Sequence, residues 1–240
     1  MKQKCIRLMA CREAIVLVGG AGTRLRAVVS DRPKPLAMVA GRPFLAWILD
    51  QLERCGMRRV ILATGYGADL VQETVGHRWG RLTVAYSREA EPLGTGGAIR
   101  LARSQLSEAE VHVLNGDTFL EYEPVALEER TRACQALLGV CLAAVADVAR
   151  YGAVTREGCR ITGFREKGAA GGGLVNAGSY YLTAEALAEL PDRRAYSFEQ
   201  DFLVPQVLAG NVIGFDATAR FIDIGVPEDY IAAQSLFRSP

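Results

Sequence analysis

The sequence predicts an α/β fold, a doubly wound and mostly parallel mixed sheet of the Rossmann-like kind. The first observation is that short apolar runs alternate with amphipathic stretches in the first half of the chain, which is typical of parallel strands joined by helices. The second is that strand-like runs follow one another directly beyond Pro124, which adds antiparallel pairs. Because half of the 240 residues are apolar and no repeat or linker divides them, we expect a single domain over residues 1–240.

The first half of the chain contains four apolar runs and three amphipathic stretches. We expect strands near residues 14–18, 59–64, 82–87 and 111–115, and helices near residues 43–55, 67–77 and 97–106. The first of these helices has one face that is apolar along its whole length. That face carries Phe44, Trp47, Ile48 and Leu52. Gly56 follows and can end the helix, so we expect this helix to pack against the core.

The second half is richer in strands. We expect strands near residues 136–145, 151–157, 160–167 and 174–182, and helices near residues 183–190, 198–209 and 227–237. A glycine-rich segment at residues 169–173 fits a hairpin loop or a mobile flap between two of the strands. The sheet is therefore expected to be mixed in this half.

Charge and cysteine content exclude several classes of protein. The formal net charge is +1 and neither sign gathers in a run, so we expect no nucleic-acid partner and no membrane surface as a partner. No apolar run approaches the ~18 residues of a membrane span, and Arg7 and Arg12 interrupt the N-terminal apolar stretch that a signal peptide would need. The six cysteines form no C-x-x-C pair. These features predict a cytoplasmic protein with reduced thiols.

A glycine-rich segment with Gly19, Gly20 and Gly22 follows the first predicted strand directly. Glycines let backbone N–H groups turn toward a phosphate, although tight turns of α/β sheets use them for other reasons as well. Two better-known phosphate loops are excluded. Leu25 stands where the dinucleotide fingerprint needs its third glycine, and the Walker sequence is absent.

Two cations accompany this segment. Arg24 can offer a planar pair of donors to phosphate oxygens, and Lys34 stands between Pro33 and Pro35 in a stiffened, extended stretch. For either cation alone, a solvated surface residue is the simpler interpretation. Beside the glycine-rich segment, both favour a phosphate-binding role.

Two carboxylates follow predicted strands. Asp117 comes after the apolar strand 111–115, and Asp223 ends a second apolar run about a hundred residues later. Such residues also serve as helix caps or turn formers. Phosphoryl chemistry, however, usually recruits Mg²⁺ through one or two carboxylates. The two histidines, His77 and His112, have no partner at a metal-binding spacing, so Asp117 and Asp223 are the candidate Mg²⁺ ligands.

These residues stand in motifs that resemble those of the sugar-1-phosphate nucleotidyltransferases. The motifs are G-G-x-G-T-R-L at 19–25, P-K-P at 33–35, P-L-G-T-G-G at 92–97, L-N-G-D at 114–117, F-R-E-K at 164–167, N-A-G at 176–178 and F-I-D-I-G at 221–225. The resemblance covers nearly the whole chain. It implies transfer of a nucleotidyl group from a nucleoside triphosphate to a sugar 1-phosphate with release of pyrophosphate. It also implies a nucleotide-binding half, about residues 13–123, and a sugar-binding half, about residues 124–240.

The resemblance implies a role for each matching residue. Among catalytic residues, Arg24 would hold the departing β- and γ-phosphates and Lys34 would neutralise the α-phosphate, while Asp117 and Asp223 would bind Mg²⁺. The nucleotide would be bound by Gly19, Gly20, Gly22, Thr23, Glu89 and Gly94. The sugar phosphate would be bound by Gly152, Glu166, Lys167 and Asn176. Without the resemblance, the Glu-Lys pair fits a solvated strand edge equally well.

The expected base is guanine. Glu89 lies just before P-L-G-T-G-G, where this family contacts the base, and a carboxylate accepts both adjacent guanine donors, N1–H and N2–H₂. Glu91 is the alternative acceptor. Residues 28–35 and 221–230 are similar to those of the D-glycero-D-manno-heptose 1-phosphate guanylyltransferases, which implies GTP and heptose 1-phosphate as substrates. The product would be GDP-heptose, a precursor of bacterial surface polysaccharide. Mannose 1-phosphate, or another sugar 1-phosphate, is the alternative.

Two other classes of function fit part of the pattern. An NAD-dependent oxidoreductase also begins with a strand, a glycine-rich loop and a helix, but the third glycine and the ribose-binding acid are missing here. A non-catalytic sensor of the same fold could bind a nucleotide sugar without turnover. Such a protein would not need Arg24, Lys34, Asp117 and Asp223 together. The sequence is compatible with a homo-oligomer and favours no particular oligomeric state.

Overall fold

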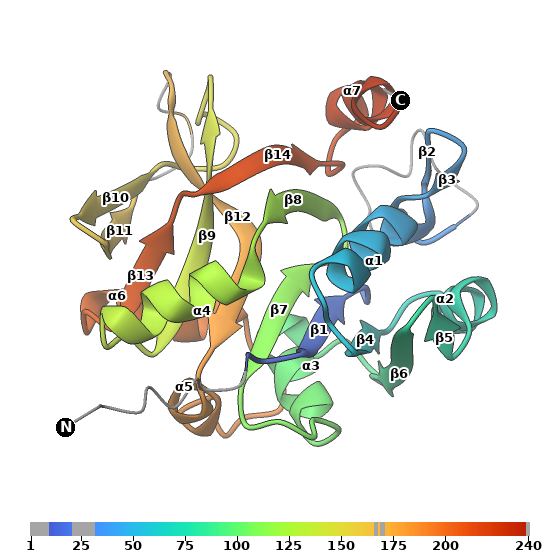
Figure 1. Ribbon diagram of the computed structural model, residues 1–240, viewed down its shortest axis with the longest axis horizontal. Coiled ribbons are helices and arrows are strands. Elements are labelled where there is room, and N and C mark those ends of the chain that lie inside the picture. Colours follow the sequence, from blue (N-terminus) through green and yellow to red (C-terminus); the bar gives the residue numbers. More distant parts are fainter. Residues whose placement is uncertain (1–9, 21–31, 166–167, 169–170, 239–240) are drawn as a thin grey trace, which may run out of the picture.

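The structure is a computed structural model that describes residues 10–20, 32–165, 168 and 171–238. Its centre is a mixed ten-stranded sheet in the order β10-β11-β13-β9-β12-β7-β1-β4-β6-β5 (Figure 1). Along the chain these strands are β1 (Glu13–Leu17), β4 (Arg59–Thr64), β5 (Arg78–Trp79), β6 (Leu82–Arg88), β7 (Val111–Asn115), β9 (Leu138–Val145), β10 (Val154–Glu157), β11 (Arg160–Phe164), β12 (Gly173–Leu182) and β13 (Val212–Phe215). Two small antiparallel sheets pair β8 (Thr118–Tyr122) with β14 (Thr218–Asp223) and β2 (Met38–Val39) with β3 (Arg42–Pro43).

Parallel pairing dominates the first half of the sheet, where β7, β1, β4 and β6 lie side by side. Strand β12 then runs antiparallel to both β7 and β9, and β13 is parallel to β9. Because β12 is hydrogen-bonded on both sides, one continuous sheet extends through both halves of the chain. The predicted fold class, a mixed α/β sheet, is confirmed.

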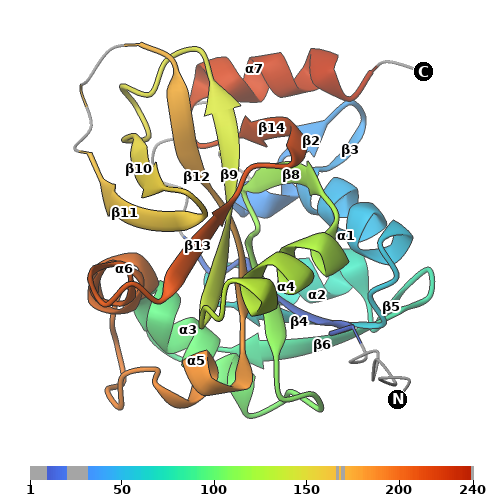
Figure 2. The ribbon, with the colours of Figure 1, turned by 60° about the vertical axis from the view of Figure 1, so that its left-hand side comes forward.

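Helices cover both faces of the sheet. One face is packed by α1 (Phe44–Arg54), α2 (Ala68–Val75), α4 (Pro124–Ala133) and α7 (Pro227–Leu236), and the other by α3 (Gly94–Arg103), α5 (Ala184–Ala188) and α6 (Val204–Leu208). Figure 1 shows α1 and α4 in front of the sheet with α3 behind it, and Figure 2 shows α7 next to β14. Each face of the sheet carries its own apolar core. In β1, Ala14 and Val16 belong to the core under α1 and α4 and Ile15 to the core under α3, as expected for a strand buried on both faces.

Most predicted helices and strands are found, but some bounds were wrong. The strand expected at 151–157 begins at Val154, and the one expected at 160–167 ends at Phe164. The helix expected at 198–209 consists of a π-helix, Glu199–Leu203, followed by α6. Pro205 has no N–H to continue the regular hydrogen-bond ladder, which explains the wider turn before it.

Helix α4 was missed at the sequence level because its buried face is partly polar. Glu128 is 0% exposed, and its carboxylate accepts hydrogen bonds from the Cys11 N–H and from Arg132 and contacts His112 Nε2 at 3.0 Å. Thr131 on the same face is also buried. An apolar stripe of helical spacing is therefore absent, although the helix packs against the core.

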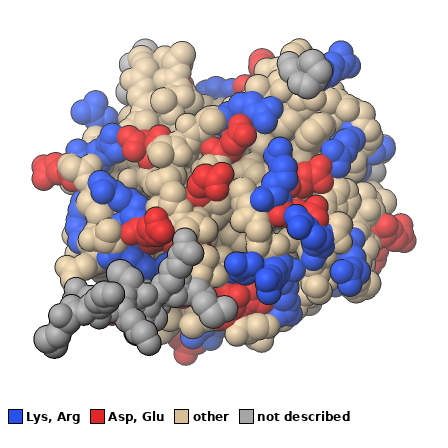
Figure 3. Space-filling view, viewed as in Figure 1, with Lys and Arg blue, Asp and Glu red and all other residues tan. Residues whose placement is uncertain are grey.

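The surface shows no concentration of one charge on the face seen in Figure 3, where blue and red side chains are interspersed. In the part of the chain that the structure describes, none of the helices is long and apolar enough to cross a bilayer.

Candidate active site

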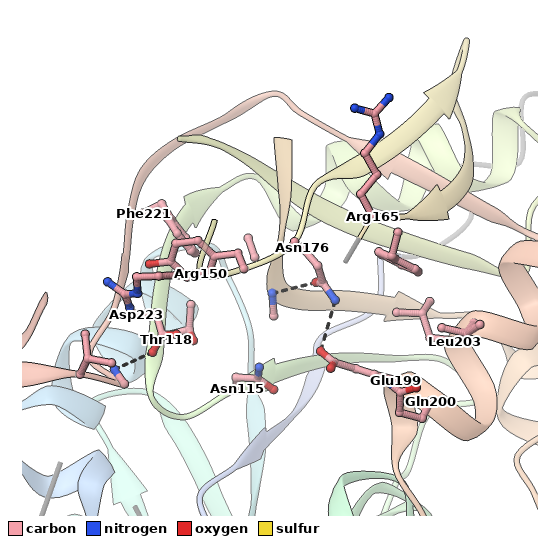
Figure 4. A pocket seen from close by; sticks show the side chains of 18 of the residues that line it. Asn115, Thr118, Arg150, Arg165, Asn176, Glu199, Gln200, Leu203, Phe221 and Asp223 are labelled. Carbon is pink, nitrogen blue, oxygen red and sulfur yellow. Dashed lines mark hydrogen bonds between the residues drawn. The ribbon is translucent and has the colours of Figure 1, made fainter. Parts of the chain in front are cut away.

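Two cavities open where the parallel strands end. The β1 cavity, of about 910 Å³, is lined by the ends of β1, β4 and β7 and by the segment after β6. The β12 cavity, of about 930 Å³, is lined by β12, by the segment after β9 and by the π-helix (Figure 4). Asn115 lines both, so the cavities adjoin at the end of β7. This is the edge where ligands of open α/β sheets bind.

Asp117 and Asp223 lie at the boundary between the two cavities. The pairing of β8 with β14 places Asp223 opposite Thr118, and the Ile224 N–H donates to the Asp117 carbonyl at 3.0 Å. Thr118 Oγ1 donates to Asp117 Oδ1 at 3.2 Å, and the Gly225 N–H donates to Asp223 Oδ1 at 2.7 Å. Backbone pairing thus brings together two carboxylates that are far apart in the sequence.

Lys34 lies between these carboxylates. Its Nζ is 2.6 Å from Asp117 Oδ2 and 3.8 Å from Asp223 Oδ1. The residue begins the short 3₁₀ helix η1 (Lys34–Leu36), and Pro35 restricts the backbone beside it. Burial raises the pKa of the Asp223 carboxyl, the charge of Asp117 raises it further, and Lys34 opposes both effects. Two repelling carboxylates share one ammonium, so the site favours additional positive charge.

The pair is suited to Mg²⁺. This ion typically takes one or two carboxylates and completes its octahedron with substrate phosphates and water. In the described ranges, no group of three or more His, Cys, Asp and Glu side chains gathers in a metal-binding arrangement. An ion at Asp117 and Asp223 would therefore need oxygens from a bound substrate, which fits a phosphate-linked Mg²⁺.

Glu89 lies in the wall of the β1 cavity. Its Oε2 accepts the Leu93 N–H at 3.2 Å, and its Oε1 lies so close to Gly65 and Gly19 that a side chain at Gly65 would collide with it. Burial raises the pKa of Glu89, and the Leu93 hydrogen bond opposes that rise. The carboxylate is thus anchored through one oxygen beside the glycine-rich turns.

Glu91, the alternative base acceptor, is in a different environment. It also lines the β1 cavity, but it is exposed and forms an ion pair with Arg194. Its carboxylate is thus already paired with a cation. The geometry therefore favours Glu89 as the group with free accepting capacity.

In the β12 cavity, Asn176 is at the centre of a hydrogen-bond cluster. Its Oδ1 accepts the Gly178 N–H at 3.0 Å, and its Nδ2 donates to Tyr180 Oη at 2.9 Å and to Glu199 Oε1 at 3.3 Å. Tyr180 Oη also donates to Glu199 Oε1 at 3.2 Å. Figure 4 shows Asn176 and Glu199 pointing toward each other across the cavity. Gly152, with φ +82°, lines the same cavity.

The predicted site residues fall into three groups. Those lining the β1 cavity are Gly19, Gly20, Lys34, Glu89, Gly94 and Asp117. Those lining the β12 cavity are Gly152, Asn176 and Asp223. Those outside the described residues are Gly22, Thr23, Arg24, Glu166 and Lys167. The structure thus brings nine predicted residues to two adjoining cavities, and the roles of all fourteen stay predictions.

Comparison with known proteins identifies the family. Residues 13–239 match the family described as Nucleotidyl transferase. The chain belongs to the nucleotidyl transferase family. It is therefore an enzyme of nucleotidyl transfer, and the resemblance drawn from the motifs is confirmed.

Several relatives of this nucleotidyltransferase are similar over almost their full length. The D-glycero-alpha-D-manno-heptose 1-phosphate guanylyltransferase of Aneurinibacillus thermoaerophilus is 41% identical, over 92% of this chain and 96% of that protein. The enzyme of the same name from Campylobacter jejuni subsp. jejuni is 38% identical, over 91% and 96%. The crystal structure of HddC from Yersinia pseudotuberculosis complexed with GMP-PN has a TM-score of 0.83 and 35% identity, and the match covers 95% of this chain and 100% of that one.

Glu199 is the residue of this nucleotidyltransferase site that sequence reasoning missed. In the sequence it belongs to a predicted helix, where a carboxylate is ordinarily a solvated surface residue. Its contacts with Asn176 and Tyr180 bring together β12 and the π-helix, which no local pattern predicts. Asn115, in contrast, stands in the L-N-G-D motif and could have been found from it.

Proposed function

We propose that this nucleotidyltransferase transfers the guanylyl group of GTP to D-glycero-D-manno-heptose 1-phosphate and forms GDP-heptose and pyrophosphate. The two guanylyltransferases with 41% and 38% identity support this substrate pair. The observation that carries the choice of GTP is the Glu89 carboxylate in the β1 cavity. Residues 13–123 would bind the nucleotide and residues 124–240 the sugar. GTP is a cytoplasmic metabolite, in keeping with the expected cytoplasmic location.

The chemistry would require positioning and charge, not a general base. One oxygen of the sugar 1-phosphate is already anionic; it attacks the α-phosphorus of GTP, a new P–O bond forms and the bond to pyrophosphate breaks. Lys34, at the boundary of the two cavities, would offset negative charge on the α-phosphate. Arg24 would hold the departing β- and γ-phosphates.

Asp117 and Asp223 would hold Mg²⁺. When bound, the ion supplies charge neutralisation to the reacting phosphates. The two carboxylates would hold the ion from opposite sides of the boundary, because Asp117 lines the β1 cavity and Asp223 lines the β12 cavity. Their position therefore suits a reaction in which one phosphate comes from each cavity.

The β12 cavity would hold the sugar. Asn176 holds Glu199 through Oε1, so the second carboxylate oxygen of Glu199 can accept from sugar hydroxyls. The Gly152 backbone would complete the pocket, with Glu166 accepting from hydroxyls and Lys167 holding the phosphate, as the family resemblance implies. A heptose offers one more hydroxyl-bearing carbon than a hexose, so this polar wall suits it.

A pyrophosphate-release assay tests the proposal. Purified enzyme is given GTP, ATP, UTP or dTTP with heptose 1-phosphate, mannose 1-phosphate or glucose 1-phosphate, and Mg²⁺. We expect the highest kcat/KM for GTP with the heptose. A preference for UTP or dTTP would overturn guanylyl transfer, and a preference for mannose 1-phosphate would replace the sugar.

Glu89→Gln is expected to erode the preference for GTP. The amide keeps one acceptor but places a donor against a guanine donor. An unpaired buried polar group costs about 1–3 kcal/mol, which corresponds to a roughly 5- to 150-fold change in kcat/KM. Values of kcat/KM for GTP, UTP and dTTP in both proteins provide the measurement. Glu91→Gln, two residues away, is the matched control and should keep the preference, because the Glu91 carboxylate is paired with Arg194. The reverse pattern would assign the base to Glu91.

Glu199→Gln is expected to raise the KM for the sugar 1-phosphate by about tenfold and to leave the KM for GTP within about twofold. The substitution keeps the size of the side chain. It replaces one accepting oxygen of Glu199, which belongs to the hydrogen-bond cluster of Asn176 and Tyr180, by a donating NH₂ group. Steady-state kinetics with each substrate varied in turn gives both constants. An unchanged KM for the sugar 1-phosphate would remove Glu199 from the sugar pocket.

A further inference from the structure

The glycines of the motif P-L-G-T-G-G contact a segment from the second half of the chain. A side chain at Gly94 would meet the carbonyl oxygen of Tyr196 at 2.5 Å, one at Gly96 would collide with the Tyr196 ring, and one at Gly97 would collide with the Arg194 carbonyl. These three positions therefore need glycine because residues 194–196 lie against them, through backbone atoms at Gly94 and Gly97 and through the Tyr196 ring at Gly96. Only Gly94 among the three lines the β1 cavity.

Hydrogen bonds join the same two segments. The Gly96 N–H donates to the Tyr196 carbonyl at 3.0 Å, and the Tyr196 N–H donates to the Leu93 carbonyl at 2.9 Å. The Phe198 N–H donates to Thr95 Oγ1 at 2.9 Å. We call this contact between residues 91–97 and residues 194–198 the junction.

The junction links the two cavities through a short chain of contacts. On one side, Leu93 donates to Glu89 in the wall of the β1 cavity. On the other, Phe198 immediately precedes Glu199 in the β12 cavity, and its ring packs edge-on against Tyr180 at 5.1 Å between centroids. A shift of residues 91–97 would therefore be passed to Glu199 through backbone hydrogen bonds.

Tyr196 occupies the centre of the junction. It is 5% exposed, its ring covers Gly96, and the Arg193 guanidinium lies over that ring at 5.5 Å from the centroid. Within the described residues its hydroxyl makes no hydrogen bond although it is buried. The ring, and not the hydroxyl, is thus what the packing uses.

We propose that Tyr196 is a positioning residue. By packing on Gly96, it makes residues 91–97 and Glu199 move together as one body. GTP bound in the β1 cavity therefore increases the affinity of the β12 cavity for the sugar 1-phosphate. The inference rests on the proposed function and deepens it, since it adds a coupling between the two substrate pockets. Coupling of this kind is reciprocal and has a measurable size.

The experiment measures the Kd of the sugar 1-phosphate by calorimetry, with and without a saturating GTP analogue. The analogue has a methylene group between the α- and β-phosphorus and therefore cannot react. In the wild type the analogue should lower this Kd by roughly tenfold or more. Tyr196→Ala should lose most of that effect while the Kd of the analogue alone changes less than about twofold. Tyr196→Phe, which removes only the unpartnered hydroxyl, should behave as the wild type.

Gly96→Ala tests the same contact from the other side. It should weaken the coupling as Tyr196→Ala does. The double variant should be no worse than Tyr196→Ala alone, because the three atoms nearest to a side chain at 96 all belong to the ring that Tyr196→Ala removes. If Tyr196→Ala does not fold, Tyr196→Leu replaces it. Undiminished coupling in the Tyr196 variant, equal loss of affinity for both ligands, or a wild type without coupling would each overturn the inference.

These outcomes are separate from a failure of the proposed function. If the wild type releases no pyrophosphate from GTP with any sugar 1-phosphate, the substrate assignment fails. If the wild type turns over and Tyr196→Ala retains full coupling, only the junction is wrong.

Discussion

Replacing Asp117 or Asp223 with Asn is expected to lower kcat by about 10²–10³-fold, the size seen when a group that stabilises transition-state charge is removed. The two carboxylates lie at the boundary of the cavities and would hold the Mg²⁺ that neutralises the reacting phosphates. Each Asn variant keeps the size of the side chain but has lost the negative charge. Pyrophosphate release at saturating substrates and Mg²⁺ gives kcat.

The fold should survive both substitutions. Burial and the neighbouring Asp117 raise the pKa of Asp223, so its ionised form is disfavoured in the folded protein. That cost to folding develops as the pH rises through the unfolded pKa and is fully present above the folded pKa. At neutral pH without metal, the Tm of Asp223→Asn should therefore equal or exceed that of the wild type.

Glu121→Gln provides the matched control for these variants. Glu121 lies on β8, four residues after Asp117, and pairs with Arg220 on β14; the two side chains are 42% and 44% exposed. Its loss should leave kcat unchanged, since exposed ion pairs contribute little. Near-normal kcat in Asp117→Asn and Asp223→Asn would contradict the metal assignment. If kcat fell by the same factor in Glu121→Gln, the cause would be damage to the β8–β14 pair instead.

Lys34→Met is expected to lower kcat by about 10²–10³-fold and to change the Kd of GTP by less than about threefold. The Lys34 ammonium lies where charge on the α-phosphate redistributes during transfer, so its contribution should be greater in the transition state than in the bound ground state. Turnover at saturating substrates and calorimetric titration with the unreactive GTP analogue separate the two effects. If kcat and GTP affinity fell by the same factor, Lys34 would be an anchor for the bound nucleotide.

Lys34→Arg is the companion variant. It keeps the charge but replaces a compact ammonium by a planar group that is too large for the space between the carboxylates. We expect kcat intermediate between that of wild type and Lys34→Met. Mg²⁺ should be saturating throughout, because Lys34 also separates Asp117 from Asp223.

Much of the fold could be predicted because its strands are apolar and short. The strand expected at 59–64 is β4, and the strand expected at 111–115 is β7, since both are buried on two faces and are mostly apolar. Helix α4 could not be predicted from such runs, because Glu128 and Thr131 occupy its buried face. Glu128 accepts from the distant Cys11 N–H, and the Thr131 hydroxyl donates to the Leu127 carbonyl one turn earlier in the same helix. The edge hairpin β10–β11 has few buried residues, so its apolar pattern does not define where the strands begin and end.

In the candidate site, too, some residues could be predicted from local sequence and others depend on distant contacts. Gly19, Lys34 and Asp117 could be proposed because each stands next to a strand end or a proline, where local sequence has a structural meaning. Glu199 could not, because its place in the cavity depends on contacts with β12. Gly94 was assigned to the nucleotide alone, and the second segment, which lies against Gly94, Gly96 and Gly97, could not be inferred from the sequence.

The pairing of β8 with β14 has a consequence for biosynthesis. Strand β14 follows β8 by about a hundred residues, and Asp223 stands at its end, so a ribosome must have made nearly the whole chain before the two carboxylates can meet. Domains generally fold as units during synthesis, and pairings this distant along the chain form slowly. Residues 194–198, which pack against the wall of the β1 cavity, are also made late. Catalytic competence would thus appear only with the final docking of β14.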